Sequence, residues 1–140
     1  MHSGALFPAQ SRSRLDVAHG VDLVEVARIE AMVGAHGSRF LDRCFTKDEQ
    51  LYAQSQPRRR FEHLAARFAA KEAGMKALGT GLRDGITWHD FAVERHATGA
   101  PHLRVTARAR EIAQSLGIQQ WVLSLSHTRG LAIASVIALR

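Results

Sequence analysis

Two carboxylates, Asp22 and Glu72, stand where the surrounding sequence is apolar. Glu72 falls inside an apolar stripe that repeats at about 100° per residue, as on one side of a helix. The stripe consists of Phe61, Leu64, Ala65, Phe68 and Met75. Asp22 lies within the run VDLVEV. A carboxylate that faces a core is costly unless it is paired, hydrogen-bonded, protonated or bound to a cation. Carboxylate oxygens are the ligands that hard divalent cations prefer, so both residues are candidate metal ligands.

Simpler interpretations of both carboxylates remain open at this point. Glu72 precedes Lys76 by four residues, and such a helical ion pair is worth roughly 0.2–0.5 kcal/mol. Asp22 could cap the helix that follows it. The residues alone do not choose between these local roles and a shared metal site.

Basic residues lie close to Glu72 in the sequence. Arg67, Lys71 and Lys76 would suit a site that holds a metal and a phosphorylated ligand, although a solvated helix surface has the same composition. The tract Gly79-Thr80-Gly81 could let the backbone approach phosphates. It lacks the length and the lysine of a nucleotide P-loop, so on its own it mainly predicts a helix end.

Nucleophilic catalysis by the protein is not expected from this sequence. His127 belongs to Ser124-Leu125-Ser126-His127-Thr128, a cluster of hydrogen-bond donors at a predicted turn. An isolated histidine there is more often structural, although such turns are also common places for ligand contacts. No Ser-His-Asp or Cys-His arrangement follows from the spacing. Cys44 is the single cysteine, which excludes an internal disulfide and a multi-cysteine zinc site and indicates a core thiol in a reducing compartment.

The elements that must position these residues alternate between strands and helices. Strand 16–24 places Val17, Val21 and Leu23 on one face and Ala18, Gly20 and Asp22 on the other. A helix follows from residue 26, with Gly34 and Gly37 as stop signals, and Thr46 to Glu49 matches a capping box that starts a short second helix.

The second half of the chain contains the longest periodic segment. The pattern predicts a helix over 61–78 that ends at Gly79. Further elements are expected as strands at 86–94 and 102–106, a helix over 107–116, and a closing hairpin made by WVLSLSH and LAIASVIAL. This order indicates an α+β domain with a mainly antiparallel sheet packed on a long central helix.

Composition limits the class of protein. With 140 residues, of which 46% are apolar, the chain suits one domain, expected over 16–140 after a mobile extension at 1–15. No apolar run approaches the ~20 residues needed to cross a bilayer, and no secretory signal is evident. The net charge of +6 makes polyanions, phosphorylated ligands or an acidic protein surface plausible partners. A small basic nucleic-acid-binding domain and a noncatalytic scaffold therefore stand as competing hypotheses.

Five blocks, in order from about residue 18 to the end of the chain, closely resemble the acyl-carrier-protein synthase type of 4'-phosphopantetheinyl transferase. They are GVDLVE at 20–25, Phe45-Thr46 with Glu49, RFAAKEA at 67–73, KALGTG at 76–81 and SLSHT at 124–128. The blocks RFAAKEA and KALGTG together are far more specific than any glycine pattern alone.

The resemblance implies an enzyme that moves 4'-phosphopantetheine from coenzyme A to a serine of apo acyl carrier protein and releases adenosine 3',5'-bisphosphate. It also implies a cytoplasmic homotrimer that binds coenzyme A at subunit boundaries and uses neither membrane nor nucleic acid. Mg²⁺ would be held by Asp22 and Glu72, and Glu72 is the candidate catalytic residue that accepts the serine proton. The residues that would bind coenzyme A are Arg67, Lys76, Gly79, His127 and Thr128. Those that would dock the acidic carrier are Arg28, Arg39, Arg58, Arg59 and Arg60.

The chain departs from the family pattern directly after KEA. The family commonly has an aromatic residue and a serine there, whereas this chain has Gly74 and Met75. Ligand contacts from those two side chains are therefore not carried over.

Overall fold

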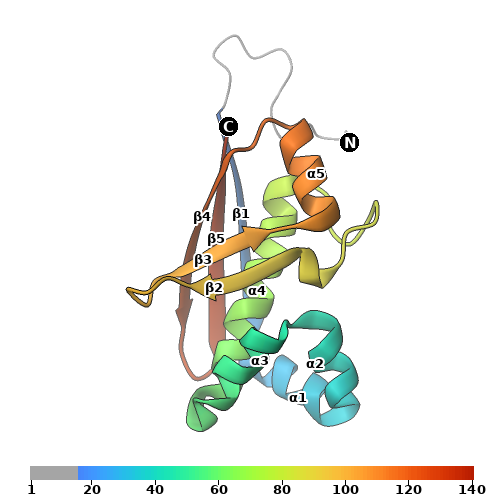
Figure 1. The fold of residues 1–140 in the computed structure, drawn as a ribbon. Coiled ribbons are helices and arrows are strands. Elements are labelled where there is room, and N and C mark those ends of the chain that lie inside the picture. The colour runs from blue at the N-terminus through green and yellow to red at the C-terminus, as the bar shows by residue number, and fades with distance from the viewer. Residues whose placement is uncertain (1–15) are drawn as a thin grey trace.

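The computed structural model describes residues 16–140, and the expected mobile extension at 1–15 lies outside the described residues. The chain runs through five strands, five α-helices and two short 3-10 helices in this part (Figure 1). In order these are β1 (Val17–Glu25), α1 (Val26–His36), α2 (Ser38–Cys44), α3 (Lys47–Gln54), η1 (Pro57–Arg59), α4 (Arg60–Leu78), η2 (Trp88–Asp90), β2 (Phe91–Arg95), β3 (Pro101–Val105), α5 (Ala107–Ser115), β4 (Gln120–His127) and β5 (Leu131–Leu139).

Helix α4 is the centre of the architecture. A three-stranded antiparallel sheet, in the order β1-β5-β4, packs along it through β1 and β5, and the antiparallel pair β2-β3 packs on another side. Figure 1 shows α1, α2 and α3 gathered at one end of the molecule and α5 at the other. The α+β class, the mainly antiparallel pairing and the long central helix are thus confirmed. None of the helices within residues 16–140 is long and apolar enough to cross a membrane.

Small residues bring β1 unusually close to α4. A Cβ added at Gly20 would clash with the carbonyl oxygen of Ala73 and lie 2.7 Å from the amide nitrogen of Ala77. Ala18, on the same face of β1, is also buried. Position 20 therefore accepts only glycine without a shift of the strand, and the face of β1 that carries Asp22 is the one turned to the helix.

The opposite face of the sheet is apolar but exposed. Six large side chains are at least two-fifths accessible there: Val17, Val21 and Leu23 from β1, Val122 from β4, and Leu131 and Ile133 from β5. The sequence analysis assigned the residues of β1 to the correct two faces. It did not predict that the face with the larger side chains would be the one exposed to solvent.

Most of the expected elements are confirmed, but helix α2 (Ser38–Cys44) was not expected, and two other elements differ in extent. The strand expected from residue 86 begins only at Phe91, because the chain first turns through η2. The buried carboxylate of Asp90 stabilises this turn, accepting hydrogen bonds from the Thr87 hydroxyl at 2.9 Å and the Ala109 amide at 3.0 Å. Helix α1 also continues through Gly34 and ends before Gly37.

Candidate active site

Two groups of candidate residues lie on different sides of α4. Arg67 and Glu72 are five residues apart, which separates them by about 7.5 Å along the axis and about 140° around it. The sequence grouped Arg67 with the cations around Glu72, and this was wrong because the two residues line different cavities.

Glu72 lies beside Asp22, as the sequence predicted. Partial burial of the Glu72 carboxyl raises its pKa, and the charge of Asp22 raises it further, while Arg28 and Lys76 act in the opposite direction. The Glu72 carboxylate makes no hydrogen bond or ion pair with any of residues 16–140. A half-buried acid next to a second acid, without a neutralising contact of its own, is electrostatically unsatisfied.

Neither of the simpler interpretations describes this pair. Lys76 forms its ion pair with Asp22, at 3.0 Å between Nζ and Oδ1, and donates a second hydrogen bond to the carbonyl of Val21. The residue that precedes α1 is Glu25, and no side chain caps the start of that helix. Asp22 is therefore not a helix cap, and Glu72 is not the ion-pair partner of Lys76.

The two carboxylates fit a hard divalent cation. Both offer oxygen atoms, and no group of three or more Asp, Glu, His or Cys side chains that could hold a metal occurs among the described residues. Mg²⁺ suits such a sparse protein contribution because it usually keeps several waters and is bound by one or two carboxylates together with substrate phosphates.

A cavity of about 310 Å³ opens next to Glu72. Its lining combines the charged groups Glu72 and Lys76 with the apolar side chains of Met75, Leu82 and Trp88, and with Gly81. Gly79 ends α4 in the left-handed region at φ 83°, which leads the chain past this cavity. The buried hydroxyl of Thr80 in the same turn has no hydrogen-bond partner within the described part of the chain.

Arg67 lines a second cavity, of about 360 Å³, between α3, α4 and β2. It is almost fully buried, and burial lowers its pKa. Its guanidinium lies 4.5 Å from the centre of the Tyr52 ring, and that of Arg95 lies 4.8 Å from the same ring. The Arg67 Nε is buried without a hydrogen-bond partner in residues 16–140, while Nη1 donates to the carbonyl of His63.

His127 joins the Arg67 side of the molecule. Its Nδ1 lies 3.0 Å from a carboxylate oxygen of Glu62, and its ring meets that of His63 at 5.0 Å between centres. Burial, followed by the charges of Arg67 and His127, lowers the pKa of His63 to about 4. Thr128 follows at the turn between β4 and β5, where its hydroxyl accepts from two backbone amides.

Lys71 does not belong to either group. Its amino group is fully buried and pairs with Glu49, with 2.9 Å between Nζ and Oε1. The sequence placed it with the cations around Glu72, and this was wrong because neighbouring residues on a helix point about 100° apart.

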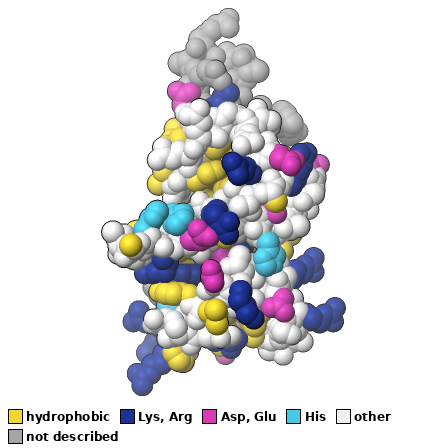
Figure 2. Space-filling view, viewed as in Figure 1, with side chains coloured by type: hydrophobic (Ala, Val, Ile, Leu, Met, Phe, Trp, Pro, Cys, Tyr) yellow, Lys and Arg dark blue, Asp and Glu magenta, His cyan; other side chains and the backbone are white. Residues whose placement is uncertain are grey.

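The arginines expected to dock a carrier are spread over the helical end of the molecule. In Figure 2, Lys and Arg side chains project from the end where Figure 1 places α1, α2 and α3. Arg28 lies over the Phe68 ring at 5.5 Å, and Arg60 over the Phe61 ring at 5.1 Å. Arg58 and Arg59 form most of η1.

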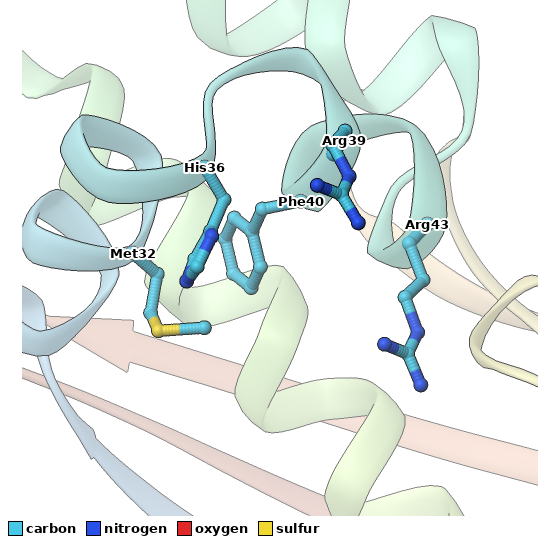
Figure 3. Close-up of a pocket in the computed structure, with 5 residues that line it drawn as sticks. All are labelled: Met32, His36, Arg39, Phe40 and Arg43. Carbon is cyan, nitrogen blue, oxygen red and sulfur yellow. The ribbon is translucent and has the colours of Figure 1, made fainter.

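Arg39 lies at a cavity of about 260 Å³ between α1 and α2. Figure 3 shows Met32 and His36 entering it from α1, and Arg39, Phe40 and Arg43 from α2. An apolar floor is thus bordered by two guanidinium groups.

Comparisons with known proteins decide the family. A sequence model described as "4'-phosphopantetheinyl transferase superfamily" matches residues 18–134. The chain belongs to this superfamily, as an enzyme of the holo-[acyl-carrier-protein] synthase type. Curated synthases of this name are 50% identical in Koribacter versatilis, over 84% of this chain and 94% of that protein, and 46% identical in Solibacter usitatus, over 86% and 96%.

Solved synthase structures share the fold. The holo-[acyl-carrier-protein] synthase from Neisseria meningitidis superposes with a TM-score of 0.78 at 31% identity, covering 88% of this chain and 98% of that one. The Helicobacter pylori synthase, solved in complex with coenzyme A, gives 0.75 at 30% identity, covering 86% and 98%.

The structure explains one departure from the usual synthase pattern. A Cβ at Gly74 would lie 2.7 Å from the Phe91 ring, so this position faces the core between α4 and β2. Phe91 occupies space that a side chain at position 74 would otherwise fill. Met75 is also buried, but it borders the cavity beside Glu72. Of the two residues that depart from the family pattern, only Met75 therefore contacts the candidate site.

Several residues of the synthase site escaped the sequence analysis. Tyr52, Glu62, His63 and Arg95 come from three elements and meet Arg67 or His127 only in the folded chain. Only the spacing of His63 and Arg67, four residues apart on the predicted helix, could have indicated one of these contacts.

Proposed function

We propose that this enzyme transfers 4'-phosphopantetheine from coenzyme A to a serine hydroxyl of an apo acyl carrier protein. The serine oxygen forms a bond to the phosphorus next to pantetheine, the bond from that phosphorus to the bridging diphosphate oxygen breaks, and adenosine 3',5'-bisphosphate leaves. The observation that carries this proposal is the meeting of Asp22 and Glu72 beside a cavity that also contains Lys76.

Glu72 is the residue best suited to accept the serine proton. Its carboxylate has no hydrogen bond or ion pair in residues 16–140, and burial raises its pKa. A carboxyl group with a raised pKa holds a proton more readily than an ordinary one, which favours general-base catalysis near neutral pH. Glu72 borders the cavity, where an incoming hydroxyl could reach it.

Asp22 and Glu72 would hold Mg²⁺ in this proposal. When bound, the ion would neutralise charge that develops on the diphosphate. Lys76 would also neutralise diphosphate charge, because its amino group lies 3.0 Å from Asp22 and its side chain is about half exposed. Gly79 lets the backbone turn past the phosphates without a side chain in the way.

The separation of the two residue groups supports a homotrimer with coenzyme A at subunit boundaries. Arg67, His127 and Thr128 lie on one side of α4, and Glu72 and Lys76 on another. A ligand that contacts both groups can be shared between two copies, each providing one group. The exposed apolar face of the sheet β1-β5-β4 is the surface that such an assembly would bury.

Charge and shape at the helical end support docking of an acidic carrier. Arg28 and Arg39 lie on α1 and α2, and Arg58, Arg59 and Arg60 precede or begin α4. The cavity at Arg39 adds an apolar floor of Met32 and Phe40 (Figure 3). A carrier helix with acidic groups around one apolar side chain would match this surface.

The direct test is incubation of the enzyme with coenzyme A, Mg²⁺ and an apo carrier protein, with the mass of the carrier as readout. We expect a mass gain of one phosphopantetheine group and no gain on a carrier whose acceptor serine is replaced by alanine. An unmodified carrier under conditions where a known synthase modifies it would refute the proposal. A basic nucleic-acid-binding domain is the alternative, and the comparisons do not favour it.

A further inference from the structure

Glu62 is the carboxylate that contacts His127 on the Arg67 side of α4. Glu62 Oε1 lies 3.0 Å from Nδ1 of His127, and both side chains are largely buried, with 15% and 21% exposed. The two residues are 65 positions apart in the sequence and join the first turn of α4 to the end of β4. The contact therefore fixes the orientation of the His127 ring, and His127 is one of the residues predicted to bind coenzyme A.

The chemistry of the carboxylate determines which ring nitrogen carries a proton. An ionised carboxylate only accepts hydrogen bonds, so Nδ1 of His127 must donate to Glu62. In a neutral ring Nε2 then carries no proton and can only accept a hydrogen bond, so it would repel a phosphate oxygen, which is also an acceptor. Only the doubly protonated ring can donate to Glu62 and to a phosphate at the same time.

We propose that Glu62 is a positioning residue that makes coenzyme A binding depend on protonation of His127. The inference rests on the proposed function, in which His127 contacts a phosphate of coenzyme A. Glu62 holds the Nδ1 side of the ring, Nε2 is left for the phosphate, and the ring takes up a proton from solvent when the ligand binds.

The groups around His127 are consistent with this role. Glu62 is the acidic residue that contacts it, His63 lies against it from the same helix, and Arg67, Arg59 and Tyr52 complete the cluster through His63. The low pKa of His63 leaves that neighbour neutral near pH 7, so it does not compete for the proton.

Calorimetry of coenzyme A binding in the absence of carrier tests this directly. Titrations at pH 8, in two buffers with different protonation enthalpies, give the number of protons taken up. At this pH a phosphate monoester has already lost its second proton, so proton uptake on binding would come from the protein. We expect the wild-type protein to take up a large fraction of one proton on binding.

Glu62→Gln should reduce both the proton uptake and the affinity. The amide of glutamine can donate to Nδ1, so the neutral ring can keep its proton on Nε2 and needs no second one. Loss of the charge-assisted arrangement should raise the Kd for coenzyme A about tenfold. Turnover at saturating coenzyme A should change much less than KM. Glu111→Gln is the matched control, because it removes one carboxylate from an exposed ion pair with Arg108 and should behave as wild type.

A purely structural tether between α4 and β4 predicts a different result. In that case Glu62→Gln lowers the melting temperature but leaves proton uptake and Kd within about twofold of wild type, and the inference is overturned. The ring nitrogens of His127 in the unsubstituted protein, observed by NMR at pH 8, give a check that needs no variant. A proton on Nε2 instead of Nδ1 in the free protein would also overturn it. Wild-type protein that transfers phosphopantetheine but binds coenzyme A without proton uptake contradicts only this inference, whereas protein that neither binds coenzyme A nor modifies a carrier contradicts the proposed function as well.

Discussion

Replacement of Lys71 by methionine should destabilise the fold strongly, although Lys71 belongs to neither half of the candidate site. The Lys71 amino group pairs with Glu49 at 2.9 Å and donates to the carbonyl of Phe91, and both charged side chains are 0% exposed. Glu49 in turn accepts from the amides of Thr46, at 2.8 Å, and Val93, at 2.7 Å. One buried ion pair thus connects α3, α4 and β2.

The expected magnitude follows from what the substitution leaves behind. Lys71→Met would strand the Glu49 carboxylate in the core without its counter-ion, and breaking a buried pair in this way costs about 3–5 kcal/mol. For a protein of this size, a loss of about 4 kcal/mol corresponds to a fall in melting temperature of roughly 8–16 °C. Burial lowers the pKa of Lys71, and the charge and hydrogen bond of Glu49 act in the opposite direction, favouring the charged amino group.

Thermal and urea unfolding measure this effect, and a double variant tests its cause. Glu49→Leu combined with Lys71→Met removes both charges and should recover most of the stability lost in the single variant, since paired apolar replacements are often neutral. Arg108→Met is the matched control, because it breaks an exposed pair with Glu111 that is worth at most ~1 kcal/mol. A fall of less than about 3 °C for Lys71→Met, or a double variant as unstable as the sum of the single ones, would refute the reasoning.

The remaining predictions concern the site, the assembly and the carrier. Glu72→Gln should sharply reduce transfer and change its Mg²⁺ dependence, and identical Mg²⁺ curves for the two proteins would contradict the metal site. Because burial and Asp22 raise the pKa of Glu72, the stability that its protonated form contributes is present at low pH and lost as pH rises through the folded-state pKa. The metal-free Glu72→Gln protein should therefore melt higher than wild type at pH 7.5 but not near pH 4. Leu23→Glu, on the exposed sheet face, should convert the expected trimer into monomers, as measured by solution scattering. A wild-type protein that is monomeric and fully active would contradict the predicted trimer. Arg39→Glu and added salt should each raise the carrier KM more than the coenzyme A KM, because the Debye screening length falls to ~3 Å near 1 M salt. A carrier KM that changes with neither would exclude electrostatic docking.

Local patterns predicted the elements that depend on local physics. The capping box at Thr46 and Glu49 forms with both hydrogen bonds, because its two partners are three residues apart. The periodicity of residues 61–78 gave α4 to within one residue, since the stripe and the glycine at its end are both local signals. The apolar patterns around Asp22 and Glu72 marked both carboxylates as candidates, but their proximity was predicted by the family resemblance.

Contacts between distant segments could not be predicted in the same way. Glu49 appeared in the sequence only as half of a capping box, yet its second oxygen binds a strand 44 residues later and its first binds Lys71. Lys71 appeared as a site cation because its neighbours in sequence are site residues. A helix directs adjacent side chains to different surroundings, so proximity in sequence does not define a shared site.

The separation of roles around α4 depends on its alanine-rich surface. Ala73 and Ala77 let β1 approach until only a glycine fits at position 20, and two residues further along the strand Asp22 reaches the surroundings of Glu72. A larger residue at the contact would move β1 outward and separate the two carboxylates. On the opposite side, the buried Lys71 fixes β2 and the cavity of Arg67. Helix α4 thus keeps the carboxylate pair of Asp22 and Glu72 apart from the cavity of Arg67. In the proposed function coenzyme A bridges the two groups, and a second copy of the chain would provide one of them.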